Sequence, residues 1–201
     1  MMDPIELSAF VMDRIDCLRT HDIEVRTSKD FDELYALDLA GKKISPFFSP
    51  DHFDLSEKNA FWVEGRRGNK VVQVHAVRVQ DSGDRPLATL WRSEFRRLFG
   101  RRDCEQIIAL EGERMSGRAT YHGDLWLSEE LRGQKLGPVF AALGICLARI
   151  MFDPDYFYGF MEDPVVWSGF NQREGFMHAA PLGEGWRLAE GFLLPSDIQT
   201  I

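Results

Sequence analysis

A six-residue segment in the second half of the chain has the composition of a turn that could hold phosphate. It reads Arg-Gly-Gln-Lys-Leu-Gly over 132–137 and leads into an apolar run that reaches Phe152. If a helix begins directly out of this turn, its first N–H groups lack intrahelical partners and its positive dipole end attracts anions. The alternative is an ordinary strand-turn-helix connection.

The residues on either side of this turn predict a strand before it and a helix after it. Alternating apolar side chains predict a strand over 118–127, in which Gly123 indicates a bulge, a close approach of a ligand or simply a weak point. Pro138 is favourable at the first position of a helix, and Asp153-Pro154 is expected to end it. The side chains expected on its buried face are Val139, Phe140, Leu143, Leu147, Ile150 and Met151.

The rest of the second half predicts further strands around a short helix. A strand is expected over 156–161, a short helix over 165–173 that Gly175 ends, and a closing hairpin of 176–180 with 186–194. Together with the predicted helix, the strands before and after it form one strand-helix-strand unit.

The first half predicts helices and one long hairpin. Helical spacing indicates a helix over 5–18 before a short strand over 23–26, and a second helix that Ser28 caps and Gly41 ends. An inserted amphipathic helix near 87–99 has a basic outer face. This face is expected to be solvated and paired with nearby acids, and the alternative is a contact with phosphate or an acidic partner.

Between these helices lie a loop and the hairpin. The loop over 42–58 carries aromatic residues and is either a packed surface loop or a flap over a cleft. The hairpin joins 61–64 to 70–80 through a turn over 65–68. Segment 104–113 has no clear pattern.

Composition and charge narrow the class of protein. The 201 residues carry a formal net charge of -8, which favours cationic substrates and disfavours nucleic acid. Cys17, Cys104 and Cys146 form neither a disulfide framework nor a zinc site, so no metal is expected. The N-terminus has no signal-peptide pattern and no apolar run is long enough to span a bilayer. We therefore expect a cytoplasmic protein without membrane contact, built as a single domain over 1–201.

Taken together, the elements predict a mixed α/β (α+β) fold. Its central sheet is expected to be largely antiparallel and flanked by helices, with one strand-helix-strand unit in the second half of the chain.

The order of these elements and the turn motif resemble the GNAT superfamily of acyl-CoA-dependent N-acyltransferases. The residues that fit the family signature are Arg132, Gly133, Gln134, Leu136 and Gly137, while Lys135 stands where the first signature Gly is usual. Gly175-Phe176, after a short helix, is similar to the common Gly-Phe near the family's C-terminal motif. The resemblance covers the chain from Arg118 to about Leu194 and reaches the earlier elements only loosely.

The resemblance implies how acetyl-CoA or another acyl-CoA would bind. The turn amides would donate to the pyrophosphate, the backbone of the preceding strand would pair with the pantetheine arm, and the gap beside the strand over 156–161 would admit the thioester. The residues expected to contact the acyl-CoA are Leu125, Leu127, Arg132, Gly133, Gln134, Lys135, Leu136, Gly137 and Asn171. Lys135 raises the question whether a Gly is needed there for positive φ, and Pro138 lacks an N–H donor.

The resemblance also implies direct transfer of the acyl group to an amine in a ternary complex. A strand amide would polarise the acyl carbonyl, and the candidates for the base are His122 and Asp124, with Glu64 and His75 as weaker options. His122 has a suitable ordinary pKa near 6.5, although a hydrogen-bonded strand histidine is an equal alternative.

The proton donor to the departing thiolate is less clear. In many relatives this donor is a Tyr four residues before the Gly of Gly-Phe, where this chain has Asn171. The proton donor in this chain could instead be Tyr158, Tyr156 or a water molecule.

The sequence thus predicts an acyltransferase, with acetyl-CoA as the expected donor and a small-molecule or peptide amine as the acceptor partner. A homodimer is compatible with it. The rival hypotheses are a non-catalytic GNAT-fold module that binds CoA or another protein, and an acyltransferase with a non-amine acceptor.

Overall fold

The structure, a computed structural model, describes residues 3–100, 110–176, 178–183 and 186–190. These residues fall into two compact units. The first contains the described residues up to Arg78 together with His122–Asp153, and the second contains those within Val79–Tyr121 and Pro154–Leu193. Strands β3 (Lys70–Asp81) and β4 (Arg118–Leu127) contribute residues to both units. The single domain over 1–201 stays a prediction.

The strands of the first unit lie in the order β1, β2, β3, β4. β1 (Glu24–Ser28) pairs antiparallel with β2 (Ala60–Arg67), which pairs antiparallel with β3. The predicted hairpin is present, but the predicted turn over 65–68 is wrong because β2 continues to Arg67, past an irregularity between Gly65 and Arg66. The chain reverses at Gly68, whose φ of +57° suits a residue without Cβ.

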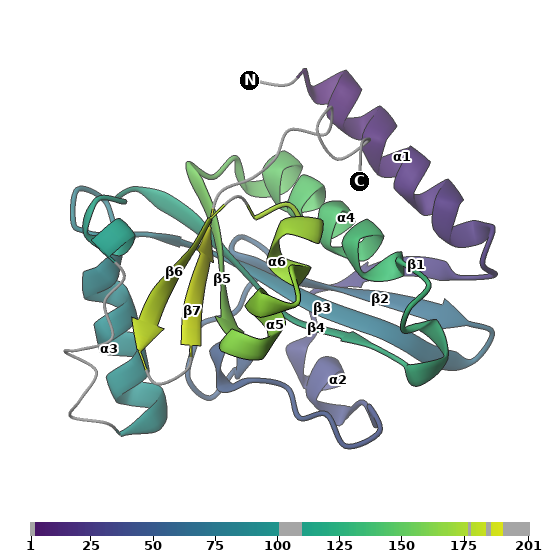
Figure 1. The fold of residues 1–201 in the computed structure, drawn as a ribbon, viewed down its shortest axis with the longest axis horizontal. Coiled ribbons are helices and arrows are strands. Elements are labelled where there is room, and N and C mark those ends of the chain that lie inside the picture. Colours follow the sequence, from purple (N-terminus) through teal and green to yellow (C-terminus); the bar gives the residue numbers. More distant parts are fainter. Residues whose placement is uncertain (1–2, 101–109, 177, 184–185, 191–201) are drawn as a thin grey trace. The chain divides into compact units, whose positions relative to one another are not determined.

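Two long helices cover one face of these strands. α1 (Pro4–Arg19) lies beside α4 (Leu136–Phe152), as Figure 1 shows. α4 packs closely on β2 because Gly65 has no side chain, and a Cβ there would lie 3.0 Å from Phe140 Cζ. Trp62 points to the opposite face, as the alternation of a strand requires, and its Nε1 donates to Asp30 O just before α2 (Phe31–Ala36).

The sequence prediction for α4 needs two corrections. The helix begins at Leu136, so Pro138 is its third residue, where the missing N–H would have had no intrahelical partner. Its buried side includes Phe140 and Leu143, but Ile150 and Met151 are 47% and 41% exposed. The predicted end at Asp153-Pro154 is confirmed, with Asp153 as the C-cap.

The other predicted elements of the first unit are present with changed bounds. α2 is much shorter than expected, because Asp30 rather than Ser28 caps it by accepting from Glu33 N, and Leu37 is already extended. The loop after it contains a 3-10 turn, η1 (Pro46–Phe48), in which Phe47 and Phe48 are buried. This loop is therefore packed against the unit.

The second unit contains the start of β4 and the strands β5 (Tyr156–Glu162), β7 (Trp186–Glu190) and β6 (His178–Gly183), in that order. β4 and β5 are parallel from Ala119↔Tyr156 to Tyr121↔Tyr158, and the other pairs are antiparallel. The hairpin predicted at the C-terminal end is confirmed within these residues. Its expected last residues, like Cys104, lie outside the part that the structure describes.

Helices of the second unit follow the sequence prediction in part. α3 (Leu87–Phe99) has the predicted bounds and ends at Gly100 in the left-handed region. A short 3-10 turn, η3 (Leu110–Glu113), follows. The single helix expected over 165–173 is wrong: α5 (Asp163–Trp167) and α6 (Phe170–Arg173) are separated by Gly169, whose φ is +73°.

The predicted fold class is confirmed. Helices flank the strands, and the pairs β1–β2, β2–β3, β5–β7 and β6–β7 are antiparallel, while β4 and β5 are parallel. No helix in the described part of the chain combines the length and the apolar character needed to cross a bilayer.

Candidate active site

The turn over 132–137 connects a short 3-10 segment, η4 (Glu129–Leu131), to the N-terminus of α4. Gly133 has a φ of +79° and open space where a Cβ would be, and Lys135, the N-cap, has a φ of +60°. The amides of Gly133, Lys135 and Leu136 donate to no oxygen among the described residues. These N–H groups and the positive end of a 17-residue helix form a place for an anion.

Side chains hold the turn in this conformation. Arg132 Nε donates to Leu127 O at 3.2 Å, which ties the turn to the end of β4, and Gln134 Nε2 donates to Glu130 O at 2.5 Å. Leu136 is buried, while the Lys135 side chain is exposed. The exposed ammonium of Lys135 thus adds a positive charge beside the backbone donors.

His122 lies in a buried pair with His75 in the first unit. Their ring centroids are 5.0 Å apart, and His122 is 4% exposed. Gln73 Nε2 lies 2.6 Å from His75 Nδ1, and since an amide nitrogen can only donate, we assign Nδ1 as the acceptor and Nε2 as the protonated nitrogen. Burial lowers the pKa of His122 to about 4, below the value near 6.5 that the sequence suggested, because a charged imidazolium loses its hydration.

Asp124 lies in β4 with a φ of +55°, so the irregularity that Gly123 indicated falls one residue later. Its side chain is 2% exposed. Ser45 N donates to both carboxylate oxygens at 3.1 and 3.0 Å, and Lys42 Nζ lies 2.8 Å from Oδ1. One backbone amide and one ammonium group therefore hold the Asp124 carboxylate.

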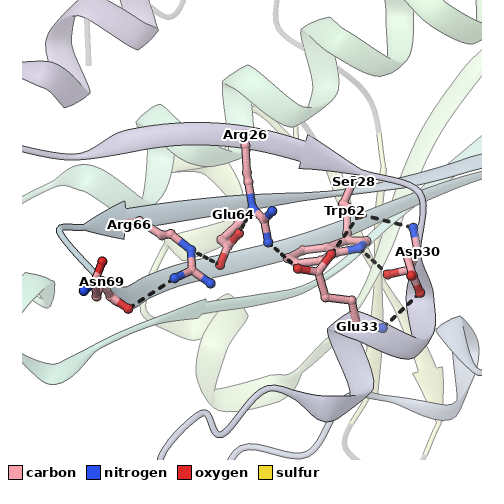
Figure 2. Close-up of polar contacts among 8 residues, drawn as sticks. All are labelled: Arg26, Ser28, Asp30, Glu33, Trp62, Glu64, Arg66 and Asn69. Carbon is pink, nitrogen blue, oxygen red and sulfur yellow. Dashed lines mark hydrogen bonds and ion pairs between the residues drawn. The ribbon is translucent and has the colours of Figure 1, made fainter.

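Glu64, a weaker candidate for the base, is fully buried within a cross-strand network, and Figure 2 shows two guanidinium groups directed at it. Arg26 Nε donates to Oε2, and Arg66 Nε lies 2.6 Å from Oε1 as an ion pair outside hydrogen-bond geometry. Arg26 also reaches Glu33 of α2. The Glu64 carboxylate is thus paired with Arg26 of β1 and Arg66 of β2, and Arg26 connects it to Glu33 of α2.

Tyr158 and Asn171 belong to the second unit. Tyr158 is fully buried and packs against Trp91, with ring centroids 4.9 Å apart. Its hydroxyl donates to Gln80 Oε1 at 2.7 Å, and Gln80 Nε2 donates to Glu94 Oε1. Asn171 is buried in α6, and Tyr156 is 38% exposed.

The structure thus brings some of the predicted site residues together. In the first unit, the turn residues adjoin the end of β4, where Leu125 and Leu127 are partly exposed. Sequence reasoning missed Lys42, Ser45 and Gln80, which contact the candidate side chains. No local pattern marks them, because Lys42 and Ser45 lie about 80 residues from Asp124 along the chain and Gln80 lies 78 from Tyr158. The described residues contain no cluster of His, Cys, Asp and Glu suited to a metal ion.

Comparison with known proteins places this geometry in a fold class. No protein-family model and no curated protein match the chain, but solved structures of N-acetyltransferases do. An agmatine N-acetyltransferase aligns with a TM-score of 0.55 at 13% identity, over 86% of this chain and 100% of that one. The Drosophila melanogaster polyamine N-acetyltransferase aligns with a TM-score of 0.50 at 14% identity, over 86% and 99%.

A third similar structure contains the acyl donor. Arabidopsis thaliana NAA60, in complex with acetyl-CoA, aligns with a TM-score of 0.50 at 9% identity, over 85% of this chain and 98% of that one. The chain therefore has the GNAT fold.

Proposed function

We propose that the protein is an acyl-CoA-dependent N-acyltransferase, with acetyl-CoA as the expected donor and an amine as acceptor. The observation that carries this proposal is the turn ahead of α4, which offers unpartnered amides next to a helix N-terminus in a chain with the GNAT fold. The acetyl-CoA complex of NAA60 and the amine substrates in the other proteins' names agree with it.

The donor would bind to the first unit at this turn and along the end of β4. The amides of Gly133, Lys135 and Leu136 would donate to the pyrophosphate oxygens, with the Lys135 ammonium adding attraction. Gln134 and Gly137 complete the turn, and Leu125 and Leu127 would pair with the pantetheine arm. Asn171 would be a further contact of the acyl-CoA.

The reaction would be direct transfer. The neutral amine attacks the thioester carbonyl, a β4 amide stabilises the charge that develops on oxygen, the C–N bond forms and the C–S bond breaks. The amine loses one proton to a base, and the leaving thiolate gains one. Asp124 and His122 are the two candidates for the base: burial leaves His122 a weak base, and Asp124 would first have to release the Lys42 ammonium. Tyr158 is the proposed donor to the thiolate, and its hydroxyl would have to leave Gln80 to serve.

Titration calorimetry with CoA tests the binding step. In wild type we expect measurable binding, which Lys135→Glu weakens about tenfold, because a charge reversal about 4 Å from phosphate changes the interaction by on the order of 1 to 2 kcal/mol in water. Lys135→Gly should stay within about threefold of wild type, because it retains the amide. Lys58→Glu, a change of the same charge at an exposed position, is the control. Equal affinity in Lys135→Glu and wild type contradicts the site.

The second candidate is a non-catalytic CoA-binding module. Two observations favour it: Asn171 stands where relatives carry a proton-donating Tyr, and Asp124 is already engaged by Lys42. Thiol release from acetyl-CoA, followed across a panel of amines, separates the two. Release with any amine excludes the module, tight CoA binding without release supports it, and mass analysis of the product identifies an acceptor other than an amine.

A further inference from the structure

The carboxylate of Asp124 lies in an unusual position for a strand residue. It follows Gly123 in β4 with a left-handed backbone, and its side chain is almost fully withdrawn from water. A left-handed backbone strains a residue that has a Cβ, and it is found mainly where the surrounding structure holds the residue in place. A buried carboxylate also needs a cation, because an unpaired charge away from water is costly.

One side of the carboxylate is bound by fixed backbone. Ser45 N donates to both oxygens, and the Ser45 carbonyl in turn accepts from Tyr35 Oη at 2.8 Å. The two residues that follow Pro46, Phe47 and Phe48, are buried. The packed loop therefore holds the Ser45 amide in place.

The second group that contacts the carboxylate is a partly exposed lysine side chain. Lys42 Nζ lies 2.8 Å from Oδ1, and the Lys42 side chain is 34% exposed. Lys42 follows Ala40 and Gly41, both with positive φ, in an exposed segment where Gly41 has open space around its Cα. The Lys42 ammonium therefore reaches the buried carboxylate from the solvent side, and it could withdraw without disturbing the Ser45 amide.

A lysine ammonium is chemically a primary alkylammonium ion. We propose that Asp124 and the Ser45 amide form a binding site for a primary alkylammonium group, and that Lys42 fills this site until such a ligand displaces it. As the place where a cationic acceptor enters, the site rests on the proposed function. The net charge of -8 favours the approach of such ligands.

The probe is n-butylammonium chloride, titrated at pH 7 without acyl-CoA and followed by the NMR signal of the Ser45 amide. We expect this signal to shift in wild type and to saturate. Lys42→Met, which removes the charge and keeps an unbranched chain, should bind the probe about tenfold more tightly, because the internal competitor is gone. Lys43→Met, an exposed neighbour, should behave as wild type. Neutral 1-butanol should cause no shift of the Ser45 amide signal. Asp124→Asn should abolish the shift that n-butylammonium causes.

The outcomes divide clearly. An unresponsive Ser45 amide in folded Lys42→Met overturns the site, and binding to Lys42→Met but not to wild type shows that the pair is a permanent structural tie. Both results hold even if Asp124→Asn does not fold. Amine binding without thiol release from acetyl-CoA would contradict the acyltransferase proposal but not this site. Thiol release in a protein whose Ser45 amide signal does not respond to amines would contradict this site alone.

Discussion

Lys135 shows how one residue can meet a backbone requirement that a different residue usually meets. It occupies the N-cap of α4 at a φ of +60°, which is favourable for glycine and strained for a residue with a Cβ. The Lys135 side chain is exposed, and no hydrogen bond or ion pair to another described residue compensates for the strain. The lysine is consistent with the proposed phosphate site, where its charge would be useful.

We therefore expect Lys135→Gly to be more stable than wild type by up to about 1 kcal/mol, since glycine relieves the strain but loses more backbone entropy on folding. Urea denaturation measures the change. Lys135→Ala is the control, because it removes the charge and the long side chain while keeping the Cβ. If alanine stabilises as much as glycine, the cause is not the backbone conformation.

At the scale of elements, α4 approaches β3 as closely as it does because Gly144 has no side chain. A Cβ at Gly144 would overlap His75 Nε2 and lie 2.7 Å from Cδ2. Together with the contact of Phe140 at Gly65, this lets the helix lie directly over the buried histidines. The position of the helix N-terminus, and so of the candidate phosphate site, depends on these contacts.

Gly144→Ala should therefore destabilise the protein by about 1 to 3 kcal/mol, the usual cost of overpacking a core. In the background of His75→Ala the same substitution should cost much less. A double-mutant cycle by chemical denaturation gives the coupling, which we expect to be at least about 1 kcal/mol. Additive effects would mean that helix and strand adjust independently.

At the scale of the whole molecule, the buried ionisable groups make stability depend on pH from both sides. In the first unit, burial lowers the pKa of His75, with the nearby His122 as a second cause, and lowers that of His122 to about 4. In the second unit, burial raises the pKa of Glu174 well above its ordinary value. These groups prefer to be neutral in the folded protein, so each opposes folding at pH values where its unfolded form is charged.

The signs follow from linkage. His122 binds its proton more weakly when folded. Above about pH 6.5 it therefore does not reduce the stability of the folded protein, and as the pH falls toward 4 it reduces that stability by roughly 3 kcal/mol in all. His75 acts in the same direction. Glu174 binds its proton more tightly when folded. It therefore does not reduce the stability of the folded protein below pH 4.5, and it reduces that stability as the pH rises toward its raised pKa.

Urea midpoints measured between pH 4 and 9 should therefore fall on the acid side. His122→Asn should reduce that fall, and Glu174→Gln should stabilise the protein at neutral and alkaline pH but not at pH 4. A Glu174→Gln gain that is the same at every pH would show that packing, and not charge, is responsible.

Most of the elements and the fold class could be predicted from the sequence. Apolar periodicity, capping residues and turn-forming glycines act between neighbours in the chain, which is why α3, β4 and β5 were predicted with nearly correct bounds. The same local signals identified the turn before α4. They were insufficient where a local preference had a competitor, as when Asp30 capped α2 in place of Ser28.

The tertiary structure alone decided the state of the candidate catalytic groups. His122 is buried beside His75, and Glu64 is paired with Arg26. Asp124 is held by Ser45 and Lys42. In each case the partners lie far apart in the chain. Burial and pairing set the charge of an ionisable group, and both arise only when distant segments pack together.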